Sequence, residues 1–137
     1  MKILIVEDEP TNRQLLQEFL TPFGDCDLAN DGREGLNNFK TAWESKQPYD
    51  LICLDIMMPN VDGIEMLRTI RDFEKSNDIY GGNRTKIIMV TAVGDHATIL
   101  ESFIGGAASY IVKPVQRKKL IQEMQNLGLI AANIDVN

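Results

Sequence analysis

Five short, largely apolar runs, separated by longer segments with helical periodicity, constrain the fold of this chain more than any other feature. A run of this kind, bounded by polar and turn residues, predicts a strand buried on both faces, as in a parallel sheet covered by helices. We therefore expect an α/β protein with a doubly wound, parallel, five-stranded sheet. The expected strands are 2–6, 26–29, 51–54, 86–90 and 109–112.

The segments between these strands carry apolar residues at the spacing of helices that cover a sheet. Pro10 suits a first helical turn, whereas Gly105, Gly106 and Gly128 are expected to end the last two helices. The polar segment 74–85 is expected to be a surface loop or a prolongation of the third helix. The apolar faces contain Leu15, Leu16, Phe19 and Leu20; Leu36 and Phe39; Ile64, Leu67 and Ile70; Ile99, Leu100, Phe103 and Ile104; and Leu120, Ile121 and Met124.

The length of 137 residues predicts one domain, which we place at 1–127, with a C-terminal tail at 128–137 that is either a frayed end or the start of a linker. Hydrophobic residues make up 44% and charged residues 25%, as in ordinary globular proteins. No apolar run reaches the roughly 20 residues of a membrane helix, so we expect no membrane contact. The start lacks a signal-peptide cleavage pattern, which indicates mature sequence that begins with a strand.

Charge and cysteine content narrow the function classes further. Twenty acidic against fourteen basic residues give a formal charge of −6, so direct nucleic-acid binding is not expected. Cys26 and Cys53 form no CxxC pair, and Cys53 lies in a buried run. Reduced thiols in a cytoplasmic protein are the favoured interpretation, and a disulfide is the alternative.

Polar residues stand where the predicted strands end. Glu7 and Asp8 follow the first strand and Asp55 follows the third; Thr91 and Lys113 follow the fourth and fifth. Each alone fits a solvated loop start or a helix cap, but parallel strands bring all of them to one edge of the sheet, which favours a functional site. Clustered carboxylates call for a hard divalent cation, Mg²⁺ above all, and a lysine and a hydroxyl beside it suit an incoming phosphoryl group.

Four motifs at these positions, "ILIVEDEP", "LICLDIMMPNVDG", "IIMVTA" and "YIVKP", closely resemble the receiver domain of two-component response regulators, over residues 2–126. The resemblance, to the chemotaxis-regulator-like single-domain type, implies a (βα)5 fold with the flavodoxin-like strand order 2-1-3-4-5. It also implies a signalling switch and not an enzyme with external substrates: such a protein catalyses only its own phosphoryl transfer and dephosphorylation.

Carried over residue by residue, the resemblance makes Asp55 the acceptor of a phosphoryl group from a histidine kinase or histidine phosphotransfer protein. It implies that Mg²⁺ is bound by Asp8, Asp55 and the backbone carbonyl of Met57, with Glu7 reaching it directly or through water. Lys113 would pair with one phosphoryl oxygen.

The same resemblance implies a switch made of Thr91, which would hydrogen-bond another phosphoryl oxygen, and Tyr110. The Lys113–Pro114 peptide matches one that is typically cis. About ten residues follow the last predicted helix, too few for an effector domain. We therefore expect output through the face of helix 4, strand 5 and helix 5 (near 97–106, 110 and 116–124), which would bind a downstream protein or a second copy.

The chain departs from the family pattern in three places. Glu7 stands where aspartate is common, and segment 74–85 is several residues longer than in compact relatives. Met57 and Val93 are apolar at positions where relatives tune the access of water, so the phosphorylated form is expected to decay slowly; packing is an equally good explanation for Met57. His96 is interpreted as a solvated residue in the loop or first turn after the fourth strand, while Trp43 and Tyr49 are expected to pack.

Three other functions fit the sequence less well. A haloacid-dehalogenase-like phosphohydrolase would need D-x-D, but Met57 stands two residues after Asp55. A flavin or nucleotide carrier lacks support because neither G-x-G-x-x-G nor a P-loop follows the first strand. A degenerate receiver that serves only for docking is disfavoured because the site is complete.

Overall fold

The computed structural model describes residues 1–58, 61–92 and 96–133. Its sheet is formed by β1 (Lys2–Val6), β2 (Asp25–Ala29), β3 (Leu51–Asp55), β4 (Lys86–Thr91) and β5 (Ser109–Val112). The α-helices are α1 (Pro10–Leu20), α2 (Gly32–Glu44), α3 (Gly63–Ser76), α4 (His96–Ile104) and α5 (Arg117–Asn126). Short 3₁₀ turns lie at Thr21–Phe23 and Gly81–Asn83.

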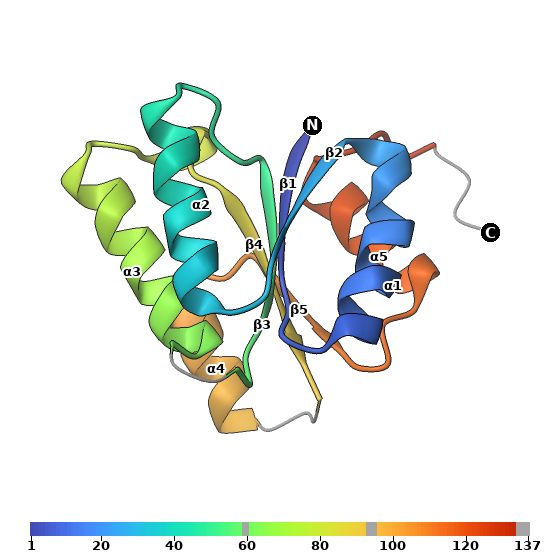
Figure 1. Cartoon of the computed structure of the whole chain (residues 1–137). Helices are drawn as coiled ribbons and strands as arrows, with labels where there is room; N and C mark the ends of the chain where they lie inside the picture. The colour runs from blue at the N-terminus through green and yellow to red at the C-terminus, as the bar shows by residue number, and fades with distance from the viewer. Residues whose placement is uncertain (59–60, 93–95, 134–137) are drawn as a thin grey trace.

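The five strands are parallel and lie in the order β2-β1-β3-β4-β5, which confirms the predicted topology. Helices α1 and α5 cover one face of the sheet, and α2, α3 and α4 cover the other (Figure 1). All strands therefore end at the same edge, where the predicted site residues lie. Within the described residues, none of the helices has the length and apolar character needed to cross a membrane.

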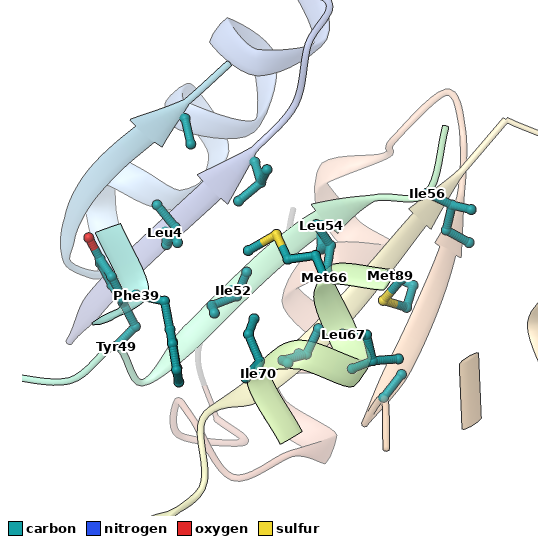
Figure 2. Close-up of a cluster of buried hydrophobic side chains, with 14 of the residues drawn as sticks. Leu4, Phe39, Tyr49, Ile52, Leu54, Ile56, Met66, Leu67, Ile70 and Met89 are labelled. Atoms are coloured by element: carbon teal, nitrogen blue, oxygen red, sulfur yellow. The ribbon is translucent and has the colours of Figure 1, made fainter. Parts of the chain in front are cut away.

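The core has one part on each face of the sheet. On the face of α2 and α3, strand side chains such as Leu4, Ile52 and Leu54 meet Phe39 and Ile70 (Figure 2). On the other face, strand residues pack against the inner sides of α1 and α5. Strand β3 is buried along its whole length, as its run of apolar residues predicts.

Segment 74–85 is only partly the surface loop that its polar composition suggests. Helix α3 extends into it as far as Ser76, and Glu74, Ile79 and Thr85 are buried. Polar residues can be buried when they are paired, and here Glu74 accepts a hydrogen bond from the backbone N–H of Thr85 at 2.9 Å. The two ends of the segment are thus joined to each other just before β4 begins, at the end of the sheet opposite the predicted site.

The residues after α5 also differ from a fully frayed tail. Gly128 has φ +74° and ends the helix, and the N–H of Leu129 donates to the carbonyl of Met124 at 3.0 Å. Leu129 and Ile130 then pack against the core on the α1 and α5 face. The domain boundary at residue 127 stays a prediction, but the packed body includes these two residues.

Candidate functional site

The ends of the strands are held in place by backbone hydrogen bonds. The N–H of Glu7, just after β1, donates to the carbonyl of Ala29 at 3.1 Å. The N–H of Lys113, just after β5, donates to the carbonyl of Thr91 at 2.7 Å. Asp55 and Thr91 are the last residues of β3 and β4, so each strand runs one residue further than the sequence predicts. All these side chains are therefore carried by rigid backbone.

Three carboxylates meet at this edge. Glu7, Asp8 and Asp55 each offer an oxygen, and these oxygens lie within 4.8 Å of one another. Glu7 is fully buried and Asp55 is 3% exposed, whereas Asp8 is exposed. The cluster therefore has a buried floor and one side open to solvent, a geometry that admits a small ligand.

Lys113 is the cation of the cluster. Its Nζ lies 2.7 Å from Oε1 of Glu7 and 3.4 Å from Oδ2 of Asp55. Its side chain is 17% exposed, so these contacts are only partly screened by water. The Lys113–Pro114 peptide bond is cis. One positive charge thus faces two buried carboxylates.

The pKa values of these three side chains reflect the excess of negative charge. Burial, together with the neighbouring Glu7 carboxylate, raises the pKa of Asp55 to about 7. Burial also acts to raise the pKa of Glu7, but the contacts with Asp55 and Lys113 outweigh it, so that this pKa is lowered. Burial disfavours the charged form of Lys113, yet its carboxylate partners raise its pKa overall. Carboxylates at this separation oppose each other's ionisation, and a divalent cation would relieve that repulsion.

The turn after β3 is fitted closely to Asp55. The N–H of Met57 donates to Oδ1 of Asp55 at 3.3 Å, which orients the carboxylate. Gly63 begins α3 against the same strand end: a Cβ there would lie 2.3 Å from the carbonyl oxygen of Asp55. Asp62 caps this helix by accepting from the N–H of Glu65 at 2.8 Å. The side chain of Met57 is 73% exposed and so is not a core gap-filler.

The predicted switch residues lie on adjacent strands. Thr91 is buried at the end of β4, while Tyr110 is half-buried on β5 and packs edge-to-face against Phe103 of α4, with ring centroids 5.7 Å apart. A hollow of about 710 Å³ lies beside Tyr110 and is lined by Phe103, Tyr110, Val112 and Lys119 among others. Tyr110 thus stands at the border between the site edge and the α4–β5–α5 face.

The structure adds two residues to those that the sequence singled out. Arg13 of α1 donates from Nη1 to the carbonyl of Glu7 at 3.0 Å. Glu9 caps α1 by accepting from the N–H groups of Thr11 and Asn12 at 3.0 and 2.8 Å. An acidic residue directly before Pro10 was the available signal for the cap, whereas nothing in the sequence indicates the contact of Arg13.

The remaining predictions concern His96, two aromatic residues, the cysteines and Val93. His96 is exposed and is the first residue of α4. Tyr49 packs in the core and donates its hydroxyl to Asp27 at 2.7 Å, and Trp43 packs against the same cluster. Cys26 and Cys53 are free thiols. Val93, for which an effect on phosphoryl lifetime was predicted, lies outside the described residues.

The chain matches a family. The family model described as "Response regulator receiver domain" matches residues 3–125. The transcriptional regulatory protein ResD of Bacillus subtilis (strain 168) is 37% identical over 127 residues, which are 92% of this chain and 47% of ResD. The chain thus spans about half the length of that relative.

Two solved structures share the fold closely. One is a chain of the CheX-CheY-BeF3-Mg²⁺ complex from Borrelia burgdorferi, with a TM-score of 0.81, 31% identity, and coverage of 93% of this chain and 89% of that one. The other is a chain of the Saccharomyces cerevisiae complex between the histidine phosphotransfer protein Ypd1 and the receiver domain of Ssk1, with a TM-score of 0.80, 30% identity, and coverage of 98% and 93%.

Proposed function

This chain belongs to the response regulator receiver domain family, and on that premise we propose that it is a phosphorylation switch in which Asp55 accepts a phosphoryl group from a phosphohistidine. The observation that carries the proposal is the position of Asp55: buried, at the end of a rigid strand, with Glu7 and Asp8 beside it and Lys113 Nζ 3.4 Å away. A weak nucleophile of this kind depends on positioning and on charge neutralisation.

In the proposed reaction an Oδ of Asp55 attacks phosphorus, the P–N bond of phosphohistidine breaks, and the imidazole leaves with the electron pair and takes up a proton. Lys113, now paired with Glu7 and Asp55, neutralises one phosphoryl oxygen. The Thr91 hydroxyl, carried at the end of β4, donates a hydrogen bond to another. The N–H of Met57 holds the carboxylate in position for attack.

The residues present fit Mg²⁺. The donor set is three carboxylate oxygens within 4.8 Å of one another, and hard oxygen ligands are those that Mg²⁺ prefers. We infer that Glu7, Asp8, Asp55 and the backbone carbonyl of Met57 hold the ion. Its chemistry there is neutralisation of charge on the transferring phosphoryl group.

The added charge at a packed edge then biases Thr91 and Tyr110, and the signal leaves through the α4–β5–α5 face. That face already exposes apolar side chains, with Leu100 at 60%, Ile104 at 78% and Val112 at 42%. We propose that it binds a downstream protein or a second copy with an affinity that depends on phosphorylation. Complexes with CheX and with Ypd1 are known for the two structural neighbours, which supports partner binding in this family.

Intact mass spectrometry after incubation with acetyl phosphate tests the proposal. The wild type is expected to gain one phosphoryl group with Mg²⁺ and none after chelation, because the cluster needs the cation. Asp55→Asn, which keeps the shape of the side chain, is the matched control and is expected to gain none. Labelling that persists in this variant would place the acceptor on another residue.

A further inference from the structure

Arg71 and Glu74, on the last turns of α3, form a buried polar network at the base of the sheet. Arg71 Nη1 lies 2.6 Å from Oε1 of Glu74 and donates to the carbonyl of Thr85 at 2.8 Å. Glu74 is 1% exposed and the side chain of Arg71 is 12% exposed. A buried ion pair keeps its geometry because separation leaves an uncompensated charge. The network is therefore a fixed point of the structure, at the end opposite Asp55.

Arg71 also binds the turn that follows α4. Its Nε and Nη2 both donate to the carbonyl of Gly106, at 3.1 and 2.9 Å. Gly106 lies in the turn between α4 and β5, with φ +102°, and the next N–H, that of Ala107, closes the helix by donating to Ser102 at 2.9 Å. Two charge-assisted hydrogen bonds to one carbonyl hold this turn on α3.

The other end of α4 begins at His96, after β4 and on the side of the site edge. His96, Ala97 and Leu100 are exposed, and Glu101, nearer the C-terminal end of α4, forms an ion pair with Arg68 of α3 at 2.5 Å. The side chains of this pair are 59% and 47% exposed, and exposed pairs contribute little. A hollow of about 740 Å³, lined by Met57, Arg68, Thr98 and Glu101 among others, lies between α4 and the turn after Asp55.

We propose that Arg71 is a positioning residue of the switch: it fixes the C-terminal end of α4 as a pivot, about which the N-terminal half moves when Asp55 is phosphorylated. This inference rests on the proposed function. Movement about such a pivot grows with distance from Gly106, so that it is smallest at Ala107 and largest at the half of α4 nearest the site. Phosphorylation would then alter the face at 97–101 most.

Methyl NMR of the full chain, with beryllofluoride and Mg²⁺ standing in for the phosphoryl group, measures this gradient. The methyl shifts of Ile99 and Leu100 are expected to change several-fold more than that of Ala107. Equal changes at both ends would overturn the pivot. Acetyl phosphate labelling runs in parallel: absence of uptake contradicts the proposed function, whereas uptake with a uniform methyl response contradicts only the pivot.

Arg71→Lys tests the residue itself, because lysine keeps the charge beside Glu74 but cannot make both bonds to Gly106. We expect the change at Ala107 to approach that at Leu100, and the amides of Gly106 and Ala107 to exchange on the order of tenfold faster. Arg68→Lys, the matched control three residues earlier, is expected to leave both readouts at Ala107 unchanged. A folded Arg71→Lys variant with the wild-type gradient would overturn the proposal; if this variant does not fold, the wild-type gradient alone decides.

Discussion

Helices α3 and α4 lie on the same face of the sheet, yet they are built differently (Figure 1). Helix α3 has 14 residues, of which six are buried, and its N-terminus is capped by Asp62. Of the nine residues of α4, all within the described ranges, only Ser102 is buried. The apolar side chains of α4 lie largely in solvent, with Phe103 at 44% and Ile104 at 78% exposure.

The difference shows that similar apolar periodicity can serve two purposes. In α3 the apolar stripe faces the sheet and contributes to the free energy of folding. In α4 much of the apolar stripe remains exposed, and a partner that covered it would bury this surface. A helix with few buried contacts also costs little to displace. On the proposed function, stability and switching would thus fall to neighbouring helices of one layer.

The largest expected effect is the difference in stability between two variants that carry the same substitution, isoleucine to alanine, one in each helix. Ile70→Ala removes a fully buried side chain of α3 and is expected to lower the free energy of unfolding by about 3 kcal/mol. Ile104→Ala in α4 is expected to change it by less than about 0.5 kcal/mol. Urea denaturation followed by circular dichroism measures both. Similar losses in the two variants would mean that α4 is packed as firmly as α3.

A second substitution tests how closely α3 is fitted to the site. In Gly63→Ala the new Cβ would meet the backbone of Asp55, which cannot yield as a side chain does, so we expect a loss of about 2 kcal/mol and slower uptake from acetyl phosphate. Gly105→Ala, just after α4, is the control. Its Cβ would meet a methyl group of Leu67 at 3.1 Å and the carbonyl oxygen of Glu101 at 3.2 Å, both farther than the 2.3 Å at Gly63, and a smaller loss is expected. A larger loss for Gly105→Ala would reverse the comparison.

The N-terminal cap of α3 is expected to contribute less to the free energy of unfolding than the core contacts of this helix. Asp62→Ala removes the acceptor for the N–H of Glu65 and is expected to cost about 1 kcal/mol in thermal or urea unfolding. Asp62→Asn retains an acceptor and should stay within a few tenths of a kcal/mol of the wild type. If both variants lose the same amount, the carboxylate charge and not the cap geometry is responsible.

The smallest effect is expected at the contact between the two helices. Glu101→Gln removes the exposed ion pair with Arg68 and should lower stability by less than about 0.5 kcal/mol. The difference from the wild type should shrink further in 1 M salt, which screens exposed charges. A loss above about 1 kcal/mol would show that this pair holds α4 in place.

Much of the architecture could be predicted because it depends on local patterns. The five apolar runs predict the strands to within one residue at each end, and the site residues follow from where those strands stop. The strand order was implied by the motifs around Glu7, Asp55 and Lys113 and is confirmed. The roles assigned to these residues remain predictions.

What could not be predicted depends on contacts between distant residues. Glu74 stands in a polar stretch that resembles a solvated loop, and its burial requires both Arg71 and the backbone of Thr85. The exposure of Leu100 and Ile104 is equally invisible, because periodicity identifies an apolar stripe but not what covers it. The same holds for Met57, whose side chain lies in solvent beside the site.

The strand order has a consequence for synthesis on the ribosome. Strand β1 is made first and lies inside the sheet, and each later strand pairs with one already made: β2 and β3 with β1, β4 with β3, and β5 with β4. Folding can therefore proceed as the chain emerges. Glu7 and Asp55 come together once β3 is in place, but Lys113 arrives only after β5. The carboxylate cluster thus gains its positive charge last, so that the site is completed only when the last strand, β5, joins the sheet.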